Sequence, residues 1–250
     1  MIAVKTEEEI KIMRQAGKLL AEVIKKIVPL VQRDVSALES DALAEKMILE
    51  AGAKPVFKGF KNYPATLCIS INNEVVHGIP TQEKIFKDGD IIGLDCGLQY
   101  KGYCADMAVT VSVGKISRHA QKLITVTRNA LYSAIKKIKP GIHLGDISWT
   151  IQNYVEKNGF SVVRELSGHG IGKELHEEPT ILNFGQPGTG PILREGMVLA
   201  IEPMINAGDW RVRTLGDGWT VVTADGSLSS HFEHTVLVTK KGAEILTLLK

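Results

Sequence analysis

The chain has 250 residues, of which 44% are hydrophobic and 23% charged, so it is neither disordered nor fibrous as a whole. Its 30 basic and 28 acidic side chains leave a net charge of +2, which gives no sign of a polyanion-binding surface. The three cysteines form no C-x-x-C pair, and no apolar run is long enough to span a membrane, so we expect a reduced, cytoplasmic protein without a membrane segment.

The first half begins with two helices. Thr6 and Glu9 have capping-box spacing and open an amphipathic helix that ends before Pro29. A second pair with this spacing, Ser36 and Glu39, opens a helix that runs to Gly52. Short β-branched segments then predict strands at 66–71, 91–96 and 108–113.

The second half repeats this order. Helices are predicted at 117–138 and 146–158, and strands follow at 161–164, 197–202, 219–223 and 231–238. The amino-acid sequence of segment 24–29 also closely matches that of segment 135–140. We therefore predict a single α+β domain over 1–250, built from two pseudo-symmetric halves, about 1–113 and 117–250, with a cleft between them.

Four acidic residues stand within or beside segments that otherwise predict buried strands: Asp95, Asp106, Glu202 and Glu233. Two like charges about 4 Å apart repel by roughly 4 kcal/mol at an effective dielectric of 20, so such a group needs compensation. Lysine or arginine partners are one answer, and Lys101 and Arg194 lie nearest in sequence. Two divalent cations are the other, since their four positive charges would cancel four carboxylates.

Two histidines add to this pattern. His169 lies in the glycine-rich segment 168–172, which we expect to be a loop where the backbone approaches a ligand closely, and His176 follows a little further along the chain. An imidazole beside several carboxylates favours a metal site over a surface histidine.

These residues occur in short sequence motifs that closely resemble those of the type I methionine aminopeptidases. The resemblance covers almost the whole chain, and the short stretch before the first predicted helix is similar to the short bacterial form. The matching phrases are SINNEVVHGIP at 70–80, GYCAD at 102–106, SVVREL at 161–166, SGHGIG at 167–172, IEPM at 201–204, DGWTVVT at 217–223 and FEHT at 232–235. Cys104 and Ala105 depart from the usual family pattern, so thiol ligation and a buried spectator thiol both stay open for Cys104.

The resemblance implies a pita-bread fold, with a curved central antiparallel sheet, and a dinuclear metal site. The expected ions are Co(II), Mn(II) or Fe(II), with Zn(II) also compatible. Asp106 and Glu233 are expected to bridge the two ions. The full implied ligand set is Asp95, Asp106, His169, Glu202 and Glu233.

The resemblance also implies the reaction, in which a hydroxide held between the two metals attacks the first peptide bond of a substrate with N-terminal methionine and a small second residue. His176 is expected to stabilise the oxyanion, His77 to contact the scissile amide, and Glu202 to carry the proton. The walls of the methionine pocket are expected to be Phe57, Phe60, Tyr63, Cys68, His77, Leu175 and Trp219. The implied substrates are nascent chains near the ribosome and free peptides, and we expect a monomer.

Three alternatives remain at this point. A proline-directed aminopeptidase or dipeptidase would share the fold, although those relatives usually carry a further N-terminal domain. A metal-free binding module would keep the fold as a docking surface. A type II enzyme is disfavoured, because the short steps from His169 to Glu202 and from Glu202 to Glu233 leave no room for its helical insertion.

Overall fold

The structure is a computed structural model that describes residues 2–248, and within them four α-helices and fifteen strands. The α-helices are α1 (Glu7–Ile27), α2 (Ala37–Glu50), α3 (Arg118–Ile135) and α4 (Leu144–Lys157), and two 3₁₀ turns span Val28–Leu30 and Phe60–Asn62. The strands of the first half are β1 (Lys54–Pro55), β2 (Leu67–Ile71), β3 (Glu74–Val76), β4 (Ile91–Tyr100) and β5 (Tyr103–Ser112). The later strands are β6 (Ser161–Val162), β7 (Ser167–Gly170), β8 (Glu177–Leu182), β9 (Val198–Ile201), β10 (Met204–Asn206), β11 (Val212–Thr214), β12 (Val221–Thr223), β13 (Ser229–His231), β14 (His234–Thr239) and β15 (Gly242–Ile245).

The helix starts follow the capping signals of the sequence. The Thr6 hydroxyl accepts a hydrogen bond from the Glu9 N–H, and the Glu9 carboxylate accepts one from the Thr6 N–H, so the predicted capping box of α1 is confirmed. Ser36 caps α2 through the Glu39 N–H in the same way. Ser117 caps α3 by accepting from the Ala120 N–H. These caps satisfy N–H groups that have no partner inside the helix.

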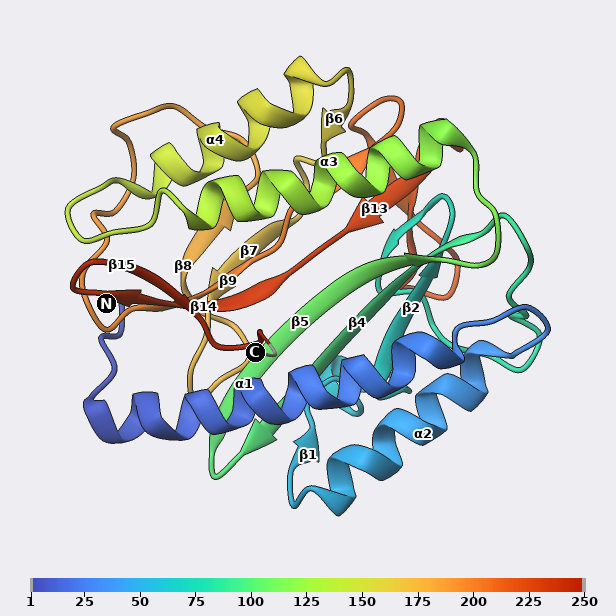
Figure 1. Ribbon diagram of the computed structural model, residues 1–250, viewed down its shortest axis with the longest axis horizontal. Coiled ribbons are helices and arrows are strands. Elements are labelled where there is room, and N and C mark those ends of the chain that lie inside the picture. The colour runs from blue at the N-terminus through green and yellow to red at the C-terminus, as the bar shows by residue number, and fades with distance from the viewer. Residues whose placement is uncertain (1, 249–250) are drawn as a thin grey trace.

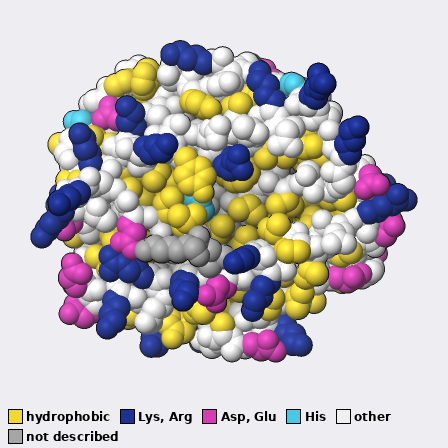
Figure 2. All heavy atoms as spheres, viewed as in Figure 1, with side chains coloured by type: hydrophobic (Ala, Val, Ile, Leu, Met, Phe, Trp, Pro, Cys, Tyr) yellow, Lys and Arg dark blue, Asp and Glu magenta, His cyan; other side chains and the backbone are white. Residues whose placement is uncertain are grey.

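All strand pairs are antiparallel and form two larger and two smaller sheets. One sheet has the order β1-β4-β2 with β5 on the other edge of β4, and the second has the order β15-β14-β9-β7-β8. The helices α1 and α2 cover the strands of the first sheet, and α3 and α4 lie over the strands of the second (Figure 1). This α+β arrangement confirms the predicted fold class. On the face shown in Figure 2, apolar side chains are visible between the two helix pairs, and Lys and Arg side chains are spread over the face and around its rim.

Two large apolar clusters form the core. One lies under α1 and α2 and draws all its members from residues 16–113. The other lies under α3 and α4 and is built mostly from residues 116–245, with Ile91 and Val109 contributed by β4 and β5. Among the described residues, no helix is both long enough and apolar enough to cross a membrane.

The two large sheets meet where β5 lies against β13 and β14. The Thr235 hydroxyl accepts a hydrogen bond from the Asp106 N–H and donates one to the Asp106 carbonyl oxygen. The Glu233 N–H donates to the Ala108 carbonyl oxygen at 2.8 Å. Residues far apart in sequence are thereby held in a fixed register at the centre of the molecule.

Several predicted boundaries were wrong. The strands predicted at 91–96 and 108–113 are the 10-residue strands β4 and β5, which meet in a tight turn at Lys101 and Gly102. Asp95 lies inside its strand as predicted, whereas Asp106, outside the predicted strand, lies inside β5. The predicted strand 231–238 is broken at 232–233 into β13 and β14. The segment around His169 is strand β7 rather than a loop.

Candidate metal centre and substrate pocket

Asp95 and Asp106 lie on neighbouring strands and face the same side of the sheet. In the β4–β5 register, Asp95 is opposite Ala108 and Asp106 is opposite Gly97, so the two aspartates are diagonal neighbours on one face. Diagonal pairs in an antiparallel sheet are within reach of each other's side chains. The two carboxylates are brought together because β4 and β5 continue beyond the apolar segments from which the strands were predicted.

His169 comes from the second sheet. It lies on β7, where it pairs with Ala200 of β9. Its Nδ1 lies 2.9 Å from the carbonyl oxygen of Gly170, which leaves Nε2 directed toward the carboxylates. The flanking glycines serve close packing, because a Cβ on Gly168 would collide with the Ala200 carbonyl oxygen and one on Gly170 with that of Glu178.

The two glutamates stand at strand ends rather than within strands. Glu202 follows β9, and Asn183 Nδ2 donates a hydrogen bond to its carbonyl oxygen. Glu233 lies in the break between β13 and β14. The acids that interrupt these apolar segments therefore mark the points at which the strands stop.

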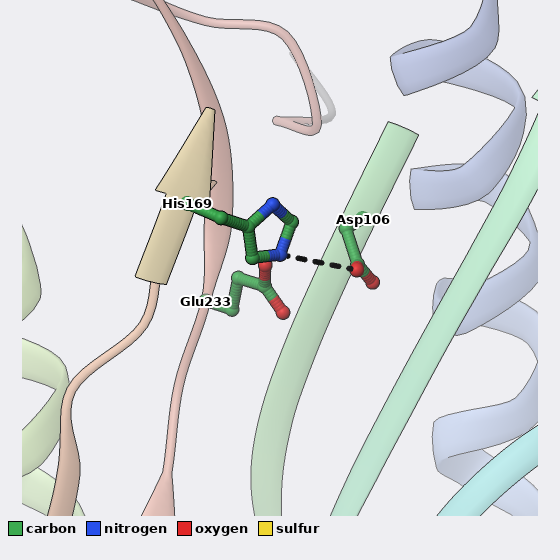
Figure 3. A group of neighbouring side chains, drawn as sticks. All are labelled: Asp106, His169 and Glu233. Atoms are coloured by element: carbon green, nitrogen blue, oxygen red, sulfur yellow. Dashed lines mark ion pairs between the residues drawn. The ribbon is translucent and has the colours of Figure 1, made fainter. Parts of the chain in front are cut away.

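Three of the predicted ligands form a tight group. One atom each of Asp106, His169 and Glu233 lies within 4.8 Å of the others. Figure 3 shows the three side chains converging from different parts of the fold, and His169 Nε2 lies 4.0 Å from Asp106 Oδ2. Glu202 Oε1 is 3.5 Å from the same His169 nitrogen. Asp95 lies outside this group but lines the same cavity.

Burial and mutual repulsion make ionisation of these acids difficult. Burial, followed by the neighbouring Asp106, holds the pKa of Asp95 well above its usual range. The pKa values of Glu202 and Glu233 are raised for the same two reasons. Burial raises the pKa of Asp106 to about 7, although the Met107 N–H donates to its Oδ1 and acts in the opposite direction. A cation would remove this penalty.

The residues present fit divalent cations. Among residues 2–248, the cationic side chains within 4.0 Å of these carboxylates are histidines alone. Lys101 lies in the exposed β4–β5 turn and Arg194 is also exposed, so neither neutralises the acids. Asp95 Oδ1 and Glu233 Oε1 are buried without a hydrogen-bond partner. Carboxylate oxygens with one imidazole form a donor set suited to Mn(II), Fe(II) or Co(II).

His176 and His77 both line the cavity that holds this centre. The His176 ring is exposed at the rim, 4.4 Å between ring centroids from His169 and 5.3 Å from Phe60. His77 has a left-handed backbone with φ of 58° and lies 6.1 Å between centroids from Trp219. Burial lowers the pKa of His77 to about 4, and partial burial of the His176 ring, followed by the charge of Lys61, lowers the pKa of His176, so both rings are neutral near pH 7.

All of the predicted site residues line one cavity of about 320 Å³. Its apolar walls include Tyr63, whose hydroxyl donates toward the carbonyl oxygens of Leu67 and Gly78 and whose ring meets Trp219 edge-on at 5.1 Å. Cys104 is outside the lining; its Sγ lies 3.6 Å from the Lys173 carbonyl oxygen, and burial raises its pKa to about 12. The predicted members of the lining are Phe57, Phe60, Tyr63, Cys68, His77, Asp95, Asp106, His169, Leu175, His176, Glu202, Trp219 and Glu233.

One buried histidine near the centre was missed by the sequence reasoning. His231 Nε2 lies 3.7 Å from Glu202 Oε2, and in sequence His231 precedes Glu233 with only Phe232 between them. The alternation of a strand would have placed it on the same side as Glu233. Met204, Val76 and Leu166 were also missed as parts of the cavity wall.

The sequence pattern of metallopeptidase family M24 matches residues 11–240. A methionine aminopeptidase of Clostridium perfringens is 52% identical over 250 residues, which is 100% of both chains. The crystal structure of methionine aminopeptidase from Thermotoga maritima has a TM-score of 0.98 at 49% identity and covers 100% of both chains. Prolidase from Pyrococcus furiosus has a TM-score of 0.81 at 25% identity, covering 99% of this chain and 66% of the prolidase.

Proposed function

This chain belongs to metallopeptidase family M24, and we propose that its clustered carboxylates and His169 hold two divalent cations at the base of the cavity. Its full-length likeness to bacterial methionine aminopeptidases makes it a metal-dependent hydrolase that removes N-terminal methionine, as its resemblance to the type I enzymes implied. The fold is the pita-bread fold of that family. The residues that hold the metals and the number of metals are the proposal.

One observation carries the proposed site. The carboxylates of Asp95, Asp106, Glu202 and Glu233 line one cavity, and among residues 2–248 no lysine or arginine nitrogen lies within 4.0 Å of them, although Lys61 and Glu165 also line the cavity. A fold that gathers such charges without a cation is destabilised by several kcal/mol for each uncompensated ion. Two divalent ions would balance four carboxylates, and we assign Asp106 and Glu233, which form one close group with His169, as the carboxylates that would contact both.

Divalent cations, when bound, lower the pKa of a coordinated water from about 15.7 toward 7 and so make a nucleophile available near neutral pH. Glu202 would accept a proton from the attacking water and deliver it to the leaving amine, since its carboxylate borders the cavity. The neutral His176 imidazole would donate a hydrogen bond to the oxyanion that forms at the scissile carbonyl. His77, which lines the same cavity, would contact the scissile amide.

Substrate selection is assigned to the apolar walls beside these groups. Tyr63 and Trp219 form an edge-on pair, and the buried Cys68 lines the same cavity. Phe57, Phe60, Leu175 and His77 complete the proposed wall. A flexible, unbranched thioether fits a pocket of this kind, and sulfur makes favourable contacts with aromatic rings. We expect substrates with a small second residue. Their expected source is nascent chains near the ribosome in the cytoplasm, and we expect the protein to act as a monomer.

The test is hydrolysis by metal-stripped protein titrated separately with Mn(II), Fe(II), Co(II) and Zn(II). A Met-Gly-type peptide should be cleaved after the first residue once metal is added, and an Xaa-Pro peptide should not. Preference for the Xaa-Pro peptide would favour the prolidase activity named for the Pyrococcus furiosus relative. A protein that binds none of the ions and stays inactive with each would instead indicate a metal-free binding module.

A further inference from the structure

His231 is a buried histidine that the proposed mechanism does not use. It ends β13, where it pairs with Met204 of β10 and is 3% exposed. Its backbone is fixed from the first half of the chain, because the Thr110 hydroxyl accepts from the His231 N–H and donates to the His231 carbonyl oxygen. The imidazole therefore projects from a rigid strand end toward the metal centre.

The side chain of Glu202 lies between two imidazoles. Its Oε1 is 3.5 Å from His169 Nε2, and its Oε2 is 3.7 Å from His231 Nε2. The two oxygens thus face different rings, one a proposed metal ligand and the other not. The second contact is too long for a hydrogen bond but within reach of a small side-chain rotation.

A structural role for the His231 ring is poorly supported. Within the described part of the chain, its Nε2 is a buried nitrogen with no hydrogen-bond partner. A buried polar group without a partner destabilises a folded protein. An imidazole carries at least one N–H in either charge state, and with the proton on Nε2 it can donate to an oxygen that faces it. The ring is therefore available to donate to whatever faces it, and Glu202 is the group that faces it.

We propose that His231 is a positioning residue that donates a hydrogen bond from Nε2 to Oε2 of Glu202 and so fixes that carboxylate for metal binding and proton transfer. This inference rests on the role of Glu202 proposed above. Direct ligation by His231 is the alternative, and the two variants below distinguish it from donation to Glu202. A fixed orientation matters because Glu202 has to hold a metal and exchange a proton with the same carboxylate.

The test compares His231→Gln, which keeps an N–H donor, with His231→Leu, which fills similar space without one. Three quantities are measured: the Mn(II) dissociation constant by calorimetry, kcat and KM on a Met-Gly-type peptide at saturating Mn(II), and the Tm of the metal-free protein. For His231→Leu we expect Mn(II) affinity and kcat each to fall by about 10- to 100-fold, the usual effect of losing a partner of a ligand. KM should change little, and the metal-free Tm should be unchanged or higher. His231→Gln should lie close to the wild type in all three.

Other results would overturn the inference. A His231→Leu protein with wild-type Mn(II) affinity and kcat, whatever its Tm, would show that Glu202 needs no such partner. Equal losses in both variants would point to ligation by the imidazole rather than donation. A wild-type protein that binds no Mn(II) would overturn the proposed function itself, whereas a wild type that binds Mn(II) no better than His231→Leu would overturn this inference alone.

Discussion

Asp106 is held by hydrogen bonds through both its backbone and its side chain. Its backbone N–H and carbonyl oxygen both pair with the Thr235 hydroxyl, and its Oδ1 accepts from the Met107 N–H. The residue is 4% exposed, so its charge is poorly solvated. These contacts hold the side chain where His169 and Glu233 converge, and this position supports the bridging role proposed for it.

The first prediction concerns Asp106→Asn. The amide keeps the shape of the side chain but removes the negative charge, so kcat/KM on a Met-Gly-type peptide should fall by more than about 100-fold, beyond the 10- to 100-fold typical of residues that merely support a ligand. Steady-state kinetics with excess Mn(II) measures this, and circular dichroism checks the fold. Full activity in the variant would remove Asp106 from the proposed ligand set.

The second prediction concerns pH and the metal-free protein. Acids with raised pKa values in the folded state bind more protons there than in the unfolded chain, so stability falls as pH rises between the two pKa values. Four acids contribute a loss of stability as pH rises. The pKa of Asp106 is about 7, and the pKa values of Asp95, Glu202 and Glu233 lie well above their usual range. Histidines with lowered pKa values have the opposite sign, but they act mainly below pH 6.5.

Metal-free protein should therefore be less stable at pH 8 than at pH 7. For each acid that stays protonated in the folded state, raising the pH by one unit lowers the free energy of unfolding by about 1.4 kcal/mol. For a chain of this length, that corresponds to a few degrees in Tm. Thermal unfolding at both pH values measures the difference. With excess Mn(II) the difference should vanish or reverse, because the metal competes with these protons. A metal-free Tm that rises from pH 7 to pH 8 would contradict the burial of these charges.

At the scale of elements, the contact between β5 and β14 places the site. Asp95 and Asp106 come from the first sheet, whereas His169 and Glu202 come from the second, and Glu233 lies where the two meet. The hydroxyl of Thr235 bonds both backbone groups of Asp106, and the Glu233 N–H bonds Ala108. The relative position of the ligands therefore depends on a few hydrogen bonds across this contact.

The third prediction tests this contact with Thr235→Val. Valine has nearly the same shape but leaves the buried Asp106 N–H and carbonyl oxygen unpaired, at a cost of about 1 to 3 kcal/mol. The metal-free Tm should fall by several degrees, and Mn(II) affinity should weaken because Asp106 shifts. Thr235→Ser is the matched control: it retains the hydroxyl and should lie between the wild type and Thr235→Val. Unchanged stability and affinity in the valine variant would show that other contacts set the register.

Elements were predicted best where a local signal defines them. The Thr6–Glu9 and Ser36–Glu39 pairs mark helix starts that the structure confirms, because capping depends on residues close together in sequence. The strands β4 and β5 were predicted too short. Gly97, Gln99 and Tyr103 show no apolar run, and their extended conformation comes from pairing across the turn rather than from their own preferences.

At the scale of the whole molecule, the proposed metals would join the two parts of the chain that supply the ligands. Cations that bind only the folded state stabilise it by about 2.7 kcal/mol at 100 times their dissociation constant. For a chain of this length that is about 5 to 10 °C in Tm.

The fourth prediction is that Mn(II) at this concentration raises the Tm of stripped protein by about 5 to 10 °C. Differential scanning calorimetry measures the shift, and Mg(II) at the same concentration controls for general salt effects. Asp106→Asn should show a much smaller rise, since it lacks a central carboxylate. A wild-type Tm that is indifferent to Mn(II) would mean that the clustered acids do not bind it in the folded state.

The sequence by itself determined the α+β class, the starts of α1, α2 and α3 and the identity of the acids that stand out against apolar strands, because these depend on local spacing and composition; α4 begins at Leu144 rather than at the predicted Asp146. The division into halves at 1–113 and 117–250 stays a prediction. Only the tertiary structure decided which of those acids meet, that His169 lies on a strand, and that His231 faces Glu202. The reason is physical: capping and side-chain alternation act over a few residues, whereas the distance between β5 and β14 is set by pairing between segments far apart in the chain.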